Sequence, residues 1–353
     1  MTENTTSILV TFVLYLAVML GIGWYFYSRT KNLSDYILGG RGLNRWVAAM
    51  SAQASDMSGW LLLGLPGFAY LAGLEAMWIA LGLGVGTYLN WRFVARRLRD
   101  YTEASSDAIT LPDYFESRFR DTSKVLRIVS AVFILIFFMI YTSSGFVAGA
   151  KLFETVFGFS YTGALVIGVL VIIVYTFLGG FMAVSWTDLI QGTLMFIAII
   201  AVPLMGLSLS GGLGGMLRTV RAIDPELLDM FTGLDGTPLG LIAIASSLAW
   251  GLGYFGQPHI LARFMAIQDP KQVTDARRIA MVWVVISLFM SVVVGIVGRA
   301  GLDARLAGAD SERVFMLLID AVFHPLLAGV MLSAILAAVM STADSQLLVS
   351  SSA

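Results

Sequence analysis

The sequence predicts an all-α integral membrane protein that crosses the bilayer several times. Of its 353 residues, 58% are hydrophobic and 13% are charged, and the mean hydropathy is +0.83. Soluble domains are about half apolar and about a quarter charged, so this chain lies outside that class. Nine apolar runs are long enough to cross about 30 Å of hydrocarbon, namely 8–27, 46–70, 74–94, 126–150, 161–180, 187–209, 239–262, 279–301 and 324–350.

The composition excludes several classes of function. A net charge of −1 gives no strong electrostatic case for binding nucleic acid. Cysteine is absent, which rules out disulfides, thiolate metal sites and cysteine nucleophiles. The two histidines, His259 and His324, lie far apart, and no metal motif, phosphate loop or nucleophile arrangement accompanies them. We therefore expect that the protein is not an enzyme and uses no organic cofactor.

Basic residues predict the orientation of the chain. The stretches 29–45, 92–127 and 263–278 fall on one side if every run crosses once, and they hold 16 of the 22 Lys and Arg residues. Because lysine and arginine accumulate in cytoplasmic loops, we expect these loops inside and the N-terminus outside. The first run has no basic residue before it and no cleavage site after it, which indicates a retained span rather than a signal peptide.

Short helices are expected in the polar segments. The stretch 110–115 has a proline in its first turn and an acid close behind, which predicts a short interfacial helix. A second short helix is expected near 311–318, whereas the loop 211–238 contains no long apolar run. No separate soluble domain is predicted. The chain ends inside an apolar run, from which we expect a longer protein.

The stretch 53–59 places Asp56 in the middle of the run 46–70. A charge near the bilayer centre costs about 3 kcal/mol, so we infer that this carboxylate serves a function. Ser58 and Gly59 weaken a helix, which predicts a break in the span. Backbone groups freed by a break are tolerated at this depth only where they line a cavity. The hypothesis is an ion and solute site, and capping of the helix after the break is the alternative role for Asp56.

A second break is predicted at 250–258, in the run 239–262. Each glycine in a helix costs about 1 kcal/mol and proline about 3 kcal/mol. Isolated glycines in membrane helices are commonly packing contacts, but here three glycines stand beside Trp250, Tyr254 and Pro258. Paired interruptions at corresponding positions of two halves indicate the midplane site of a transporter.

The third polar stretch, 337–345, lies in the last run. On a helix, Ala338, Ser341, Thr342 and Ser345 fall largely on one face. Small residues allow close approach to another helix, and neighbouring hydroxyls offer the hard oxygen ligands that cations such as sodium prefer. The alternative for each hydroxyl is a hydrogen bond to the carbonyl one turn back.

Five motifs along essentially the whole chain resemble the sodium/solute symporter family. Their order and number make the resemblance specific. They are SDYILGGR at 34–41, SAQASDMSGW at 51–60, LPDYF at 111–115, AWGLGYFGQPHILARFM at 249–265 and MSTADSQLL at 340–348.

The resemblance implies an inverted-repeat fold of five plus five helices in the bacterial cytoplasmic (inner) membrane. The whole chain, 1–353, would be a single transmembrane transporter domain. Within it, 1–45 would be an extra N-terminal span with its loop, 46–209 the first repeat and 239–353 an incomplete second repeat. Family members continue beyond Ala353, and the last two helices of the second repeat are absent from this sequence.

The resemblance also implies sodium as the coupling ion and L-proline as the solute, carried by symport without an obligatory protein partner. Asp56 would support the ion by its charge. A second ion site would use Asp188, Asp344 and Ser345, although Asp188 alternatively serves as an acid at a helix start. The implied sodium ligands are the carbonyls of Ala54, Met57 and Ala338 and the hydroxyls of Ser341 and Thr342.

The implied solute site joins the two broken spans. Aromatic and apolar walls suit a pyrrolidine ring, while a helix N-terminus and hydroxyls suit a carboxylate. Two alternatives stay open: a sodium symporter for another small solute, and the transporter-like input domain of a membrane sensor kinase. The residues implied for solute binding are Ser58, Gly59, Trp60, Tyr141, Trp250, Tyr254 and Pro258.

Overall fold

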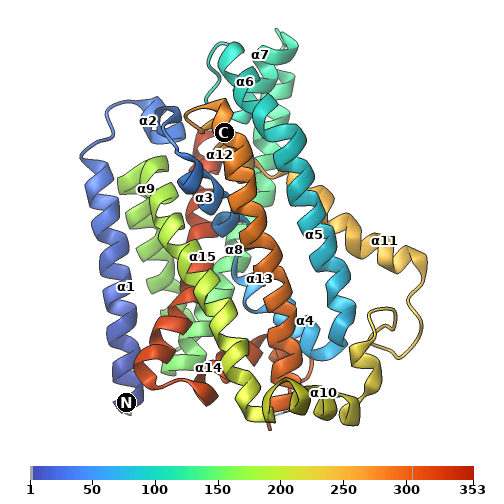
Figure 1. Cartoon of the computed structure of the whole chain (residues 1–353). Helices are drawn as coiled ribbons and strands as arrows, with labels where there is room; N and C mark the ends of the chain where they lie inside the picture. The colour runs from blue at the N-terminus through green and yellow to red at the C-terminus, as the bar shows by residue number, and fades with distance from the viewer. Residues whose placement is uncertain (1–2, 304) are drawn as a thin grey trace.

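The computed structural model describes residues 3–303 and 305–353, and this part of the chain is almost entirely helical (Figure 1). Six helical stretches in the described part are long and apolar enough to cross a membrane, and two shorter apolar helices accompany them. The nine predicted runs all coincide with helical segments. The number of spanning stretches is smaller than the number of runs partly because one stretch, 59–104, contains residues of two runs. Four runs each lie within a long helix of their own: α1 (Glu3–Tyr27), α8 (Val125–Phe157), α13 (Val273–Gly301) and α15 (Pro325–Ser352).

The helix α9 (Tyr161–Gly206) contains two of the predicted runs, joined without a loop. Gly180 has φ 60° and ψ −162°, which breaks the helix between the two halves. A side chain could not replace this glycine, because a Cβ there would lie 2.8 Å from the ring of Tyr36. The boundary predicted at 180 is therefore confirmed.

The first predicted break lies at Ser58. Helix α3 (Arg45–Met57) ends there, and α4 (Gly64–Ala72) begins after a short 3-10 turn. Ser58 has φ 48°, in the left-handed region that L-residues rarely adopt. Its hydroxyl accepts a hydrogen bond from the N–H of Trp60 at 3.2 Å. The side chain that caps the turn after the break is thus Ser58 and not Asp56.

The second predicted break is also confirmed. Helix α11 (Leu241–Ala249) passes into the 3-10 segment η7 (Trp250–Gly256), and α12 (Pro258–Met265) follows. Gln257 is extended, with φ −78° and ψ 104°, and proline occupies the first turn of α12, where its missing N–H costs nothing. The third polar stretch does not interrupt its helix, because α15 is continuous through 337–345.

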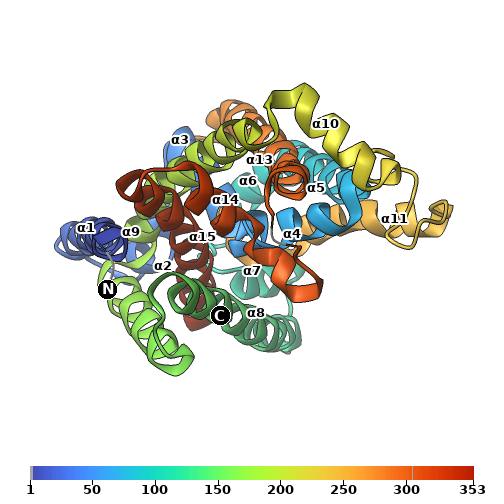
Figure 2. The same cartoon turned by 90° about the horizontal axis from the view of Figure 1, so that it is seen from below.

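Helix α15 forms the centre of the molecule. It is the most buried of the six spanning stretches, and it packs against α1, α3, α8 and α9. Figure 2 shows it among these helices when the molecule is seen from below. The second broken segment packs differently, because η7 lies against α5 (Met77–Leu89).

The basic loops gather at one end of the molecule. Arg41 connects them: its guanidinium lies 2.9 Å from a carboxylate oxygen of Asp107 and donates to the carbonyls of Ala108 at 3.1 Å and Met265 at 2.7 Å. Figure 1 places the C-terminus at this end and the N-terminus at the other. The short helices at the basic end are α2 (Leu33–Leu38), α6 (Arg96–Ala104) and α7 (Leu111–Phe119).

The short helices of the polar segments lie at both ends of the molecule, α7 at the basic end and α10 and α14 at the other. The expected interfacial helix at 110–115 is confirmed as α7, whose cap Thr110 accepts from the N–H of Asp113. The helix expected at 311–318 begins slightly later, as α14 (Val314–Val322), because a 3-10 turn precedes it. The loop 211–238 contains a helix that we did not predict, α10 (Gly212–Ile223), since its three glycines obscure the helical pattern.

Backbone contact between α5 and η7 gives a test of this packing. A Cβ on Gly86 would lie 2.2 Å from the carbonyl oxygen of Gly251, whereas a Cβ on Gly84 would meet nothing within 4 Å. We expect Gly86→Ala to lower the free energy of unfolding by about 1–3 kcal/mol through overpacking. Gly84→Ala, on the same helix, is the control and should be neutral or stabilising. Thermal unfolding of the purified protein in detergent measures both, and equal melting temperatures would contradict this packing.

Candidate ion and solute site

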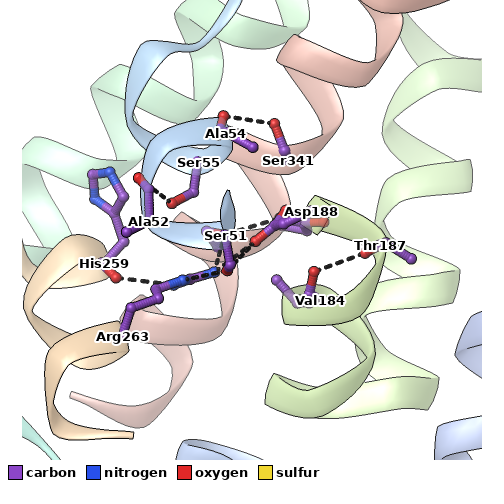
Figure 3. Close-up of polar contacts among 12 residues, drawn as sticks. Ser51, Ala52, Ala54, Ser55, Val184, Thr187, Asp188, His259, Arg263 and Ser341 are labelled. Atoms are coloured by element: carbon purple, nitrogen blue, oxygen red, sulfur yellow. Dashed lines mark hydrogen bonds and ion pairs between the residues drawn. The ribbon is translucent and has the colours of Figure 1, made fainter. Parts of the chain in front are cut away.

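Oxygen atoms from α3 and α15 meet beside the first break. The last four carbonyls of a helix have no partner within it and carry a partial negative charge, and Ala54 lies in the last turn of α3. Ser341 on α15 donates to the Ala54 carbonyl at 2.8 Å (Figure 3). The Ala338 carbonyl accepts from Ser341 at 3.3 Å and from Thr342 at 3.1 Å. All of these residues are buried, so four of the five predicted ion ligands form one cluster.

The remaining predicted groups of the ion site lie at the end of α3. Met57 is buried, and its sulfur lies 3.9 Å from the hydroxyl of Tyr254, in the second broken segment. The Asp56 carbonyl accepts from the Tyr141 hydroxyl of α8 at 3.3 Å. One carboxylate oxygen of Asp56, Oδ2, is buried and accepts no hydrogen bond from any residue that the structure describes. A cation could satisfy this oxygen.

A cavity of about 120 Å³ separates the two broken segments. It is small beside the few hundred Å³ of drug-sized ligand pockets, so it suits a small solute. The rings of Trp60 and Trp250 meet over it, with centroids 5.1 Å apart. Sequence reasoning missed Leu83, Gly253 and Gln257 in its lining. The predicted residues that line it are Asp56, Met57, Ser58, Trp60, Tyr141, Trp250 and Tyr254.

Two predicted solute residues do not line this cavity. Gly59 is buried, and a Cβ there would make only ordinary van der Waals contact with Val339 of α15, at 3.4 Å. Pro258 lines a larger and mostly apolar groove of about 750 Å³ between α8 and the second broken segment. The groove and the cavity share Tyr141, Gly253 and Gln257, so the two spaces are neighbours.

A buried ion pair lies one helical turn from the ion cluster. Arg263 on α12 contacts Asp188 on α9, with Nη2 to Oδ2 at 3.1 Å and both side chains completely buried. Ser51 on α3 donates to the same carboxylate oxygen at 2.6 Å and accepts from Arg263 Nε at 2.9 Å (Figure 3). Arg263 also donates to Ser345 on α15 at 2.5 Å and to the His259 carbonyl at 3.0 Å. Four helices are thus joined by one guanidinium.

The three residues predicted for a second ion site lie together in this network. Ser345 donates to Asp344 at 3.1 Å and accepts from Arg263, which also neutralises Asp188. The position of Asp188 is therefore more than that of an acid at a helix start. Any second cation would have to share the Asp188 carboxylate with Arg263.

Sequence reasoning missed Arg263 and Ser51. Arg263 counted as a loop charge because it follows the apolar run, yet it stands between Ala262 and Phe264, and α12 buries it completely. An arginine flanked by apolar residues was the available signal. His259, one turn earlier, is also buried, with neither ring nitrogen paired in the described part of the chain, and it packs on Phe138.

Comparison with known proteins identifies the family. The family model described as the sodium:solute symporter family matches residues 36–353. The chain belongs to this family. The symporter is therefore an integral membrane transporter and not an enzyme, and sodium is its coupling ion.

Relatives of high sequence identity support the same assignment. The sodium/proline symporters of Salmonella typhimurium and Escherichia coli are each 52% identical over 99% of this chain and 70% of their own length. The osmoregulated proline transporter of Bacillus subtilis is 48% identical over 98% of this chain and 70% of its own.

The solved structures bear on the fold alone. A Na+-coupled sialic acid symporter in a substrate-bound outward-open state aligns with a TM-score of 0.83 at 20% identity, covering 98% of this chain and 73% of its own. A nucleobase-cation-symport-1 family transporter aligns with a TM-score of 0.54 at 15% identity, covering 91% and 68%. The expected symporter fold is confirmed.

Removing one partner of the buried ion pair tests its role in the symporter. Arg263→Met leaves Asp188 charged and uncompensated in the interior, so we expect a loss of about 3–5 kcal/mol in the free energy of unfolding. Arg263→Met combined with Asp188→Leu should recover most of that loss. The exposed pair Arg45–Asp275 is the control, and Arg45→Met should cost less than about 1 kcal/mol. Denaturation in detergent measures all of them, and equal effects of Arg263→Met and Arg45→Met would refute the prediction.

Proposed function

We propose that the symporter takes up L-proline together with sodium across the bacterial inner membrane. One observation carries the proposal: the oxygen cluster of Ala54, Ser341 and Thr342 adjoins a small aromatic cavity between the two broken segments. The bacterial relatives 48–52% identical to this chain that are named proline symporters or proline transporters support the choice of solute.

Sodium occupies the cluster between α3 and α15. Its ligands are the carbonyls of Ala54, Met57 and Ala338 and the hydroxyls of Ser341 and Thr342. Hard cations favour such oxygens. The hydroxyl hydrogens now directed at the Ala54 and Ala338 carbonyls rotate away, so that lone pairs face the ion. Asp56 lies between two of the carbonyl donors along the chain, and its charge favours the cation.

Proline occupies the neighbouring cavity. The rings of Trp60, Trp250 and Tyr254 receive the pyrrolidine ring, and the hydroxyls of Ser58 and Tyr141 face the polar groups of the amino acid. Gly59 and Pro258 act through the backbone: Gly59 begins the 3-10 turn after the first break, and Pro258 starts the helix after the second break. Asp188, Asp344 and Ser345 remain a proposed second ion site, in which Arg263 already supplies one positive charge.

The N-terminus lies outside and the basic end of the molecule lies in the cytoplasm. The positive-inside rule supports this orientation, because the three basic stretches gather at one end. The single transporter domain, 1–353, comprises an N-terminal span with its loop (1–45), a first repeat (46–209) and an incomplete second repeat (239–353).

Sodium binding drives uptake because both ligands stabilise the same pair of elements. Sodium joins α3 to α15 and so orders the end of α3, which also lines the solute cavity. Each ligand therefore raises the affinity for the other reciprocally. One charge moving through about 100 mV provides roughly 2.3 kcal/mol, and a tenfold sodium gradient adds about 1.4 kcal/mol. Together they support roughly 500-fold accumulation for one ion per proline.

Removal of one hydroxyl ligand tests the ion site. Ser341→Ala and Thr342→Ala should each raise the sodium concentration for half-maximal uptake by roughly tenfold or more, since a hydrogen bond to a charged group contributes about 1.5–3 kcal/mol. Ser333→Ala is the control, because Ser333 lies on the same helix, is buried and donates to the Gly329 carbonyl, its one side-chain hydrogen bond among the described residues. Uptake of radiolabelled L-proline into proteoliposomes, with and without an inward sodium gradient, is the measurement. If the unmodified protein showed neither sodium-dependent uptake nor binding of proline, the proposed solute would be wrong. A panel of other small solutes would then be tested, together with the alternative that the chain is the input domain of a membrane sensor kinase.

Shortening one aromatic wall tests the solute cavity separately. Trp250→Ala should raise the KM for proline about tenfold, corresponding to about 1.4 kcal/mol of lost contact, while half-saturation by sodium at high proline changes little. Leu252→Ala, on the same segment with 67% of Leu252 exposed, should leave both constants unaltered. An equal rise in KM for the two variants would place the solute elsewhere.

A further inference from the structure

A groove of about 620 Å³ runs along the outer side of α1 and α9, away from the transport site. One wall is the face of α1 from Val18 to Phe26, and the other consists of Met182, Trp186 and Ile190 on α9. The rings of Phe26 and Trp186 are stacked, with centroids 6.2 Å apart, and form the floor between the helices. Figure 1 shows α1 at the edge of the molecule beside α9.

The groove has room for a linear apolar chain. Gly21 lies in its wall, and a Cβ at this position would meet nothing within 4 Å. Val18 and Tyr25, on the same face, are about half exposed. Because this surface faces the hydrocarbon of the bilayer, the chain that fills it is the acyl chain of a lipid.

One end of the groove carries a positive charge without an acidic partner among the described residues. Arg29 lines the groove and lies over the ring of Tyr25, with its guanidinium carbon 4.2 Å from the ring centroid. Among the described residues no carboxylate forms an ion pair with it. Several arginines at the same end do have such partners: Arg41, Arg45, Arg99 and Arg127 pair with Asp107, Asp275, Glu103 and Asp113.

Arg29 lies at the depth of the lipid headgroups. It follows the last turn of α1, at the basic end of the molecule, and exposed Trp24 and Tyr27 precede it. Tryptophan and tyrosine concentrate at the membrane–water interface. Basic pockets between membrane helices on the cytoplasmic side bind anionic headgroups, and a guanidinium can bind phosphate through two parallel hydrogen bonds.

We infer that the α1–α9 groove is a binding site for an anionic phospholipid. Its acyl chain lies between α1 and α9, and its phosphate contacts Arg29. Charge selects the headgroup, since a zwitterionic lipid would bring its own cation close to the arginine. The apolar floor of Phe26 and Trp186 orients the chain along the helix axis.

Two substitutions separate the charge from the groove. Arg29→Gln removes the headgroup contact, and Gly21→Leu fills the groove from a position where a Cβ would meet nothing within 4 Å. The matched controls are Arg97→Gln, which removes one exposed charge at the same end of the molecule, and Gly168→Leu, which adds the same side chain to another open surface on α9.

Native mass spectrometry of the purified protein, titrated with phosphatidylglycerol or phosphatidylcholine, measures the binding. We expect a saturable phosphatidylglycerol adduct whose apparent Kd rises about fivefold or more in Arg29→Gln and in Gly21→Leu. The two control variants should retain this adduct. Phosphatidylcholine should bind the unmodified protein no more tightly than it binds Arg29→Gln. Thermal unfolding without added lipid verifies that all four variants are folded. Equal binding of the two lipids, or an equal loss in Arg29→Gln and Arg97→Gln, would overturn the inference.

Discussion

A buried arginine determines how the helices of this symporter fit together. Several kcal/mol are required to desolvate each charge of the Arg263–Asp188 pair, so the pair is stable only when its remaining hydrogen bonds are made. Ser51, Ser345 and the His259 carbonyl, from three different helices, accept the remaining hydrogen bonds of the guanidinium. Ser51 also donates to Asp188 Oδ2, whereas Asp188 Oδ1 accepts no hydrogen bond from the described residues. The ion pair is therefore weak evidence for stability as such. It constrains the arrangement, because a shift of any one of these helices leaves a buried charge unsatisfied.

This network fixes the ion cluster through helix geometry. Ser51 and Ala54 are three residues apart on α3, and Ser341 and Ser345 are four apart on α15, so each pair occupies one face of its helix. The contacts to Arg263 thus hold the two helices together one turn away from the oxygen cluster. A sodium ion bound there, as proposed, would not need to bring the helices together. It would need only to rotate two hydroxyls and to neutralise the free oxygen of Asp56, which would lower the cost of binding.

Much of the fold could be predicted because membrane burial makes polar residues conspicuous. The breaks at Ser58 and at 250–258 and the helix after Thr110 follow from local chemistry, namely glycine, proline and capping. The ion cluster could be predicted only through resemblance, since nothing local brings Ala54 to Ser341. Arg263 was missed because composition does not distinguish an arginine at the end of a span from one in a loop. The contact of α12 with α3, α9 and α15 makes that distinction, and it is a tertiary property. The sequence likewise did not predict that Pro258 lies outside the cavity, because this depends on the extended backbone of Gln257 before it.

The glycine contact between α5 and η7 limits the degrees of freedom of the second broken segment. The two backbones are in direct contact at Gly82, Gly86 and Gly251, with no side chain of these residues between them. Sliding of α5 past η7 is opposed sterically, because it would drive carbonyl oxygens into the opposing chain. On the opposite side of the cavity, Tyr141 of α8 reaches the end of α3 through a side-chain hydrogen bond to the Asp56 carbonyl. The two walls of the cavity are therefore built differently: one by backbone packed on backbone, the other by a side-chain hydroxyl.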